Sequence, residues 1–224
     1  MIPYKDDNPT RTAPYLTVGI IVLNVVVFLI QVAFRSKMEL ITYNYGAIPH
    51  NLVTFESRQP VHPALTVFSS MFMHGGLFHL GGNMLYLWIF GNNIEDRLGH
   101  LRFLIFYLFC GIFAAYSHAI TNAGSTIPMI GASGAVSGIL GAYLLLFPRA
   151  RVHTLLILGF FITTVRIPAL IVIGFWAFIQ FLNGIISSGL QNSGGVAWFA
   201  HVGGFLIGLL TIKLWLPRGV RQWS

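Results

Sequence analysis

The sequence predicts an all-α membrane protein built as a bundle of six transmembrane helices, and two observations carry this prediction. The 224-residue chain is 55% hydrophobic and only 8% charged, with a mean hydropathy of +0.75. A soluble domain carries about 25% charged residues. Apolar runs long enough to cross a bilayer, about 20 residues each, also recur along the chain. The lipid bilayer is therefore the expected surrounding of most of the protein.

Six apolar segments are predicted to span the membrane. They cover residues 15–34, 77–92, 101–120, 133–147, 167–186 and 196–216. The first is a full-length apolar run, which favours a retained span over a signal peptide. The apolar segment 154–165 is too short to cross a hydrocarbon core of about 30 Å, and Arg166 and Pro168 follow it. It is predicted to lie in the membrane interface and not to form a seventh span.

The predicted organisation is an N-terminal cytoplasmic segment (1–14), a six-span domain (15–216) and a cytoplasmic C-terminal tail (217–224). With both termini inside, ten basic residues lie on the inner side: Lys5, Arg11, Arg97, Arg102, Arg149, Arg151, Arg166, Lys213, Arg218 and Arg221. Only Arg35, Lys37 and Arg58 lie outside. Because cytoplasmic loops collect Lys and Arg, this count favours two cytoplasmic termini.

The same count explains the net charge of +7, so we expect no nucleic-acid partner. The expected location is a multi-pass position in the inner or plasma membrane of a bacterium or archaeon. The single cysteine, Cys110, lies in the third span, where we expect it to pack as a small apolar side chain.

Polar residues meet at one depth in three of the predicted spans. Under this topology the second, fourth and sixth spans run in the same direction, so their first turns lie in one leaflet. These turns carry His79 and Asn83, Ser133, and His201, respectively. Ionisable side chains inside a membrane are energetically costly and indicate function. The sequence therefore predicts a site that brings these four residues together.

Small residues are expected to bring the serine and the histidine into contact. Gly134 and Gly138 follow Ser133 along the fourth span, and Gly204 and Gly208 follow His201 along the sixth. Small residues let membrane helices approach closely, and close approach brings an imidazole within hydrogen-bond reach of a hydroxyl. The free N–H groups at the start of the fourth helix would face a developing oxyanion. Because every acidic residue lies outside the spans or at the wrong end of the second one, the expected arrangement is a Ser–His dyad.

From about Phe72 to Leu210, the chain resembles the rhomboid family of intramembrane serine proteases. The resemblance rests on an ordered set of motifs: His79-x-x-x-Asn83, Gly91-Asn-Asn-Ile-Glu95-Asp96-Arg97-Leu-Gly99, Gly131-Ala-Ser133-Gly134 and Ala200-His201-Val-Gly-Gly204. It implies a six-helix bundle that cleaves other membrane proteins near their outer ends with a Ser133–His201 dyad. It also implies that His79 and Asn83 line the oxyanion site. No metal or other cofactor is expected.

In one respect this chain departs from the pattern. Many members carry an aromatic residue four positions after the nucleophile, where it packs on the histidine ring, and this chain has Ser137 there. Two other functions remain open. A transporter or channel would show inverted repeats, interrupted helices or polar groups through the full membrane depth. A catalytically inactive relative would bind client membrane helices without Ser133 or His201, and this chain keeps both.

Overall fold

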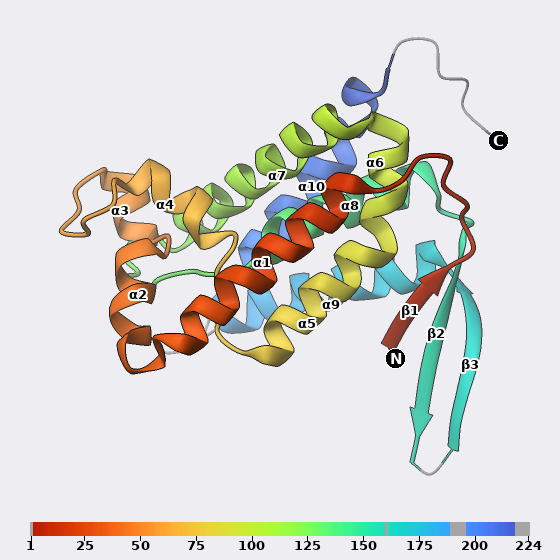
Figure 1. Ribbon diagram of the computed structural model, residues 1–224, viewed down its shortest axis with the longest axis horizontal. Coiled ribbons are helices and arrows are strands. Elements are labelled where there is room, and N and C mark those ends of the chain that lie inside the picture. Colours follow the sequence, from red (N-terminus) through yellow and green to blue (C-terminus); the bar gives the residue numbers. More distant parts are fainter. Residues whose placement is uncertain (1, 160, 189–195, 218–224) are drawn as a thin grey trace.

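The computed structural model describes residues 2–159, 161–188 and 196–217, in which long helices form a bundle with roughly aligned axes (Figure 1). The main helices are α1 (Tyr15–Ala33), α5 (Leu77–Tyr86), α7 (His100–Thr121), α8 (Ser133–Leu146), α9 (Ala169–Ser188) and α10 (Trp198–Trp215). Apart from the second predicted span, the predicted bounds agree with these helices to within two residues. The chain is a helical membrane protein, as the composition predicts.

Length and hydropathy separate these helices into two groups. In the described part of the chain, the four helices long and apolar enough to cross a membrane are α1, α7, α9 and α10. The helix α8 has 14 residues and is apolar but shorter, and its residues from Gly134 to Tyr143 are all buried. It is therefore surrounded by protein and has little contact with lipid. The count of six spans stays a prediction.

The second predicted span is longer than expected and is not a regular helix. After α5, a π-helical turn, η2 (Leu87–Gly91), leads into α6 (Asn92–Leu98) without a break in the chain direction. A π-turn holds one more residue than an α-turn. Its residues Leu87, Ile89 and Phe90 are all buried in the core beside α8. The helical path thus continues to Leu98, beyond the predicted end at Asn92.

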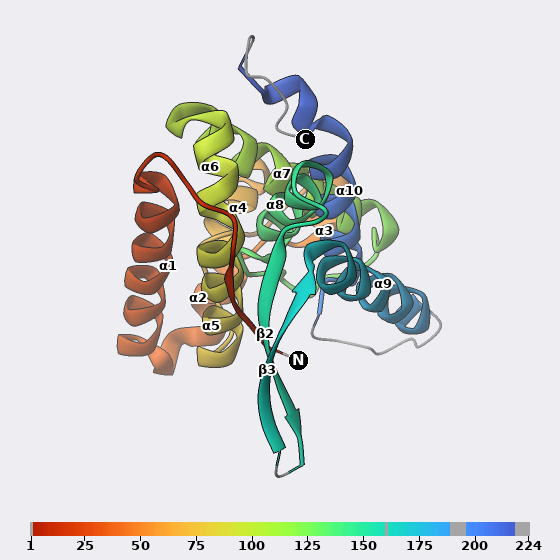
Figure 2. The ribbon, with the colours of Figure 1, turned by 90° about the vertical axis from the view of Figure 1, so that its right-hand side faces the viewer.

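A small antiparallel sheet is the main feature that the sequence did not predict. Its order is β1-β2-β3, with β1 (Ile2–Asp6), β2 (Arg151–Leu158) and β3 (Phe161–Pro168). Figure 2 shows the β2–β3 hairpin extending away from the helices. The predicted interfacial segment 154–165 is part of this hairpin, and the N-terminal segment pairs with it. The physical reason is the run of β-branched residues, such as Thr154 opposite Val165, which favours a strand.

Two acidic side chains of α6 hold the beginning of α1. Glu95, fully buried, accepts hydrogen bonds from the backbone N–H groups of Leu16 (2.9 Å) and Thr17 (2.7 Å). Asp96 accepts bonds from the N–H groups of Arg11 (3.0 Å) and Thr12 (2.8 Å). The first N–H groups of a helix have no hydrogen-bond partner within the helix. A carboxylate accepts hydrogen bonds from them, and its negative charge interacts favourably with the positive end of the helix dipole. These bonds therefore tie the N-terminal segment to the bundle.

The strand β1 has its own attachment to the bundle. Oδ2 of Asp6 accepts hydrogen bonds from the Asn93 amide (2.9 Å) and from the hydroxyl of Tyr143 on α8 (2.5 Å). Burial raises the pKa of Asp6 above its ordinary value, and these hydrogen bonds oppose the rise. The N-terminal segment is thus packed against the bundle through Asp6.

At the opposite end of the bundle from the sheet, the long first loop folds into short helices (Figure 1). They are η1 (Arg35–Lys37), α2 (Met38–Tyr45), α3 (Pro49–Thr54) and α4 (Pro63–Ser70). An isolated bridge between Ala47 and Met129 connects this loop to the segment that precedes α8. The loop thus packs beside the end of the bundle at which Ser133 lies.

Candidate active site

Ser133 and His201 are in direct contact. Ser133 is the first residue of α8, and His201 lies in the first turn of α10. The Ser133 Oγ and the His201 Nε2 are 2.7 Å apart, a hydrogen-bond distance. Both residues are partly buried. A hydroxyl and an imidazole at this separation can exchange a proton.

The contact depends on the close packing of α8 against α10. A Cβ atom added at Gly204 would lie 2.1 Å from the carbonyl oxygen of Gly134, and one at Gly208 would lie 2.0 Å from that of Gly138. Such distances leave no room for any side chain, so the two backbones touch. The glycine pairs that the sequence suggested as packing residues therefore meet each other, as is typical of small-residue helix interfaces.

His201 has a second hydrogen-bond partner that the sequence analysis missed. The His201 Nδ1 lies 2.7 Å from Oε1 of Gln180, a buried residue of α9. The imidazole is also flanked by two indoles, with centroid distances of 6.2 Å to Trp176 and 6.0 Å to Trp198. Gln180 is a rare polar residue in an apolar segment, and this feature of the sequence could have marked it as a candidate site residue.

The position that carries an aromatic residue in many rhomboids has another use here. Ser137 is fully buried, and its hydroxyl donates a hydrogen bond to the backbone oxygen of Ser133 (2.6 Å). The Ser137 hydroxyl, one turn along the helix, thus satisfies a carbonyl of the first turn of α8. In this chain, the side chains that flank the His201 ring are Trp176 and Gln180 of α9 and Trp198 of α10.

His79 and Asn83 line the same pocket as Ser133 and His201, a cavity of about 610 Å³. Gly131 lies between the two parts of the site, with φ of +131°, a conformation that L side chains rarely adopt. A Cβ atom there would lie 2.7 Å from His79 Nε2 and 3.6 Å from Ser133 Oγ. A glycine at this position thus lets His79 come close to Ser133.

Asn83 is buried, and its Nδ2 has no hydrogen-bond partner among the described residues. A buried amide donor without a partner carries a desolvation penalty, and it is ready to bind an acceptor that enters the pocket. No acidic side chain is among the described residues that line this cavity. Within the described ranges, no group of three His, Cys, Asp or Glu residues is arranged to hold a metal ion.

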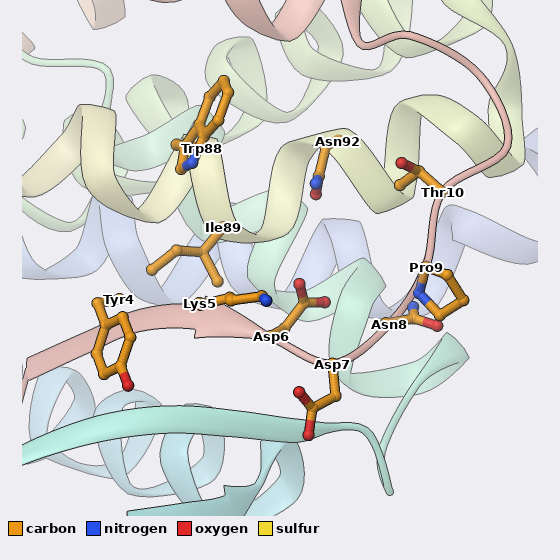
Figure 3. A pocket seen from close by; sticks show the side chains of 10 residues that line it. All are labelled: Tyr4, Lys5, Asp6, Asp7, Asn8, Pro9, Thr10, Trp88, Ile89 and Asn92. Atoms are coloured by element: carbon orange, nitrogen blue, oxygen red, sulfur yellow. The ribbon is translucent and has the colours of Figure 1, made fainter. Parts of the chain in front are cut away.

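A different pocket of about 600 Å³ lies at the other end of the α5–η2 helix, between β1 and residues such as Trp88 and Ile89 (Figure 3). Both of its carboxylates are engaged. Asp6 binds Tyr143 and Asn93, and Asp7 lies 2.5 Å from Nε2 of His153. None of the described residues that line this pocket is a serine or a histidine, so we place the candidate site in the cavity around Ser133.

The fold and this cavity define a class: a helical membrane protein with a serine and a histidine in contact inside its bundle. Comparison with known proteins gives the family. A model of the Rhomboid domain matches residues 62–218, and the chain therefore belongs to the rhomboid family.

Similar proteins come from several kinds of organism. The rhomboid protease GluP of Bacillus subtilis is 28% identical over 216 residues, which cover 96% of this chain and 37% of that protein. The mitochondrial Rhomboid protein 1 of Saccharomyces cerevisiae is 29% identical over 151 residues, 65% of this chain and 40% of that protein. RHOMBOID-like protein 1 of Arabidopsis thaliana is 29% identical over 157 residues, which cover 70% of this chain and 36% of that protein. This chain matches about two fifths of the length of these relatives.

Proposed function

We propose that this chain is an intramembrane serine protease that hydrolyses peptide bonds in or near the transmembrane segments of other membrane proteins. The observation that carries the proposal is the 2.7 Å contact between Ser133 Oγ and His201 Nε2. A serine is a weak nucleophile until an adjacent base takes its proton. Membership of the rhomboid family and the similarity to a protein named as a protease in Bacillus subtilis support this function.

The reaction would proceed by acyl transfer. His201 Nε2 takes the Ser133 proton as Oγ attacks the carbonyl carbon of the substrate, which forms a tetrahedral oxyanion. When this intermediate collapses, the C–N bond breaks and His201 gives the proton to the leaving amine. Water then attacks the resulting ester, with His201 again as base, and releases the carboxylic acid and Ser133.

The oxyanion would be bound by three donors: the backbone N–H of Ser133, the His79 ring and the Asn83 amide. The start of α8 supplies the backbone donor together with the positive end of the helix dipole. The unpartnered Asn83 Nδ2 supports a role in binding an acceptor that arrives with the substrate.

Asn83→Ala is expected to slow turnover by roughly 10²–10³, because one oxyanion donor is lost while the backbone donor remains. The effect should fall mainly on kcat, since the negative charge develops only in the transition state. Steady-state cleavage of a transmembrane reporter, measured together with thermal unfolding, checks this. A variant with unchanged stability and unchanged kcat would remove Asn83 from the mechanism.

The pocket is also suited to a substrate that arrives through lipid. Its lining includes Phe78 of α5, which is 96% exposed, and Trp176 of α9, a helix apolar enough to face lipid. A transmembrane segment of a substrate would reach Ser133 along such walls without passing through water. The substrate class we propose is therefore a transmembrane protein and not a soluble peptide.

A transporter or channel is less well supported, because His79, Asn83, Ser133 and His201 lie in the first two turns of α5, α8 and α10 and not along their full length. An inactive relative is also less well supported, since Ser133 and His201 are both present and in contact.

The experiment that tests the proposal is covalent labelling. A fluorophosphonate should form its adduct on Ser133 of the purified, detergent-solubilised chain, as located by peptide mass spectrometry. No adduct, or an adduct confined to another serine, would contradict the proposed function.

We further propose that the chain lies in the inner or plasma membrane of a bacterial or archaeal cell, with both termini in the cytoplasm. The excess of basic residues in the segments assigned to that side supports this orientation. In a Cys110→Ser background, a cysteine placed at Asn122 should react with an impermeant maleimide from outside intact cells. A cysteine placed at Leu216 should react only after permeabilisation. The reverse pattern would overturn the orientation.

A further inference from the structure

Gln180 lies on the side of the His201 ring opposite Ser133, within hydrogen-bond reach of Nδ1. We infer that Gln180 is a positioning residue, which fixes the tautomer and the plane of His201 so that Nε2 is free to take the Ser133 proton. This inference rests on the proposed function and adds to it a third residue that acts through His201. The amide takes the place that a carboxylate holds in a Ser-His-Asp triad.

The argument begins with hydrogen-bond chemistry. A neutral imidazole carries one N–H and one lone pair, and which nitrogen holds the proton is set by the partners. Oε1 of Gln180 can only accept a hydrogen bond, so at 2.7 Å it selects the tautomer with hydrogen on Nδ1. The lone pair then lies on Nε2, directed at the Ser133 hydroxyl 2.7 Å away. The other tautomer would set the Nδ1 lone pair against the Gln180 oxygen, so that two acceptors face each other. Its Nε2–H would donate to Ser133 Oγ, and the serine would have no base.

The surroundings of Gln180 keep this contact in place. The residue is 8% exposed, and it lies one turn after Trp176 on α9, whose indole is 6.2 Å from the imidazole and inclined to it by 39°. Trp198 contacts the ring from α10 at an interplanar angle of 90°. Two indoles and one amide thus restrict the rotation of His201, a restriction that Ser137 does not provide because its hydroxyl binds the Ser133 backbone.

A neutral amide also suits the low dielectric of this site. A carboxylate taken out of water without a matching charge is strongly destabilised, and no basic side chain is among the described residues that line the cavity other than its histidines. An amide orients the imidazole through one hydrogen bond without bringing a buried charge. When His201 becomes protonated during the reaction, the hydrogen bond from Nδ1–H to Oε1 becomes charge-assisted and stronger.

Three variants test the inference. Gln180→Met removes the acceptor at similar volume, and Gln180→Glu restores an acceptor oxygen at the same position. Phe181→Met is the matched control, because Phe181 is the next residue of α9 and is 49% exposed. For Gln180→Met we expect kcat and the rate of fluorophosphonate labelling to fall roughly 10- to 100-fold, with KM changed by less than about twofold. Gln180→Glu should recover only part of this loss, because the acceptor oxygen returns on a carboxyl group that this site disfavours. Phe181→Met should match the native chain.

The second measurement is ¹⁵N NMR of histidine-labelled protein, with the His201 signals identified by their loss in His201→Ala. In the native chain Nδ1 should be the protonated nitrogen, and in Gln180→Met the proton should also appear on Nε2. A purely structural role of Gln180 would lower the unfolding temperature without changing the tautomer, and that result would overturn the inference. So would native kcat and labelling in Gln180→Met. The native chain and Ser133→Ala are measured in parallel: a native chain that neither labels nor cleaves refutes the proposed function itself, whereas a labelled native chain with an unaffected Gln180→Met refutes only the role of Gln180.

Discussion

Ser133→Ala is expected to reduce cleavage of a transmembrane substrate by roughly 10⁴-fold or more, to the level of a substrate-only control. The variant removes the atom that would attack the carbonyl and leaves His201 with no proton to take. The fold should survive, because the hydroxyl that is lost bonds the His201 side chain and no backbone group among the described residues. The measurement is product formation from a reporter co-reconstituted in liposomes, followed by gel analysis, with thermal unfolding of the same preparations.

Ser117→Ala is the matched control for this prediction. Ser117 is also a helix serine, and its hydroxyl bonds only the backbone oxygen of Phe113 one turn earlier, at 2.7 Å, so this variant should cleave normally. His201→Ala should be as inactive as Ser133→Ala and should also lose fluorophosphonate labelling. Cleavage by Ser133→Ala clearly above the substrate-only level would rule out the Ser133 mechanism.

Gly208→Ala is expected to destabilise the fold and to remove most of the activity at the same time. The added Cβ would lie 2.0 Å from the oxygen and 2.6 Å from the carbonyl carbon of Gly138, and backbone atoms cannot move aside as a flexible side chain does. The helices α8 and α10 must then separate. Overpacking typically destabilises by about 1–3 kcal/mol, and a shift of about 1 Å at a reacting pair can reduce turnover by roughly 10²-fold.

Gly19→Ala on α1 is the control for this variant, because a Cβ at Gly19 meets nothing within 4 Å. Alanine is the better helix former, so Gly19→Ala should be neutral or slightly stabilising. Thermal unfolding in detergent and kcat for the reporter check both variants. If Gly208→Ala unfolds and cleaves like the native chain, the backbone contact between α8 and α10 is not as close as described.

Hydropathy alone predicted the bounds of α1, α7, α8, α9 and α10 to within two residues, because length and apolar composition are properties of single segments. It placed the start of the fourth segment at Ser133, which is where α8 begins. It also placed Ser133, His201, His79 and Asn83 at one depth, and the structure brings all four to one cavity. The alternating direction of successive spans was sufficient to predict this common depth. The depth of a residue in the membrane depends on its place along its span and on the direction of that span, and not on how the helices pack.

Gln180 was not predicted for a different reason. Whether a residue of α9 faces His201 or lipid depends on the rotation of α9 against α10, which is a matter of tertiary packing. The same holds for Trp176, which lies beside the imidazole. The partners of Glu95 depend on tertiary packing as well, because Leu16 and Thr17 meet its carboxylate only where the start of α1 packs against α6. A further contact of Glu95 is with Nδ1 of His100, at 2.6 Å.

The β2–β3 hairpin was missed because its segment 154–165 is as apolar as a membrane segment. Residues 154–165 contain few charges, and a short apolar run does not distinguish a strand from a helix. The partner strand comes from the other end of the sequence, with Ile2 opposite Leu155, and no local pattern reveals such a distant pairing.

The π-turn at Leu87–Gly91 affects how related chains should be aligned with this one. Each residue of a regular helix advances by about 100°, so one extra residue rotates everything after the turn by about that angle. Glu95 therefore takes the angular position that residue 94 would have in an uninterrupted helix, and there it meets the start of α1. A relative that lacks this residue would keep its histidine and asparagine in place while its acidic pair faced another way. A single-residue gap in this stretch of an alignment therefore records a change of helical phase and not a change of loop length.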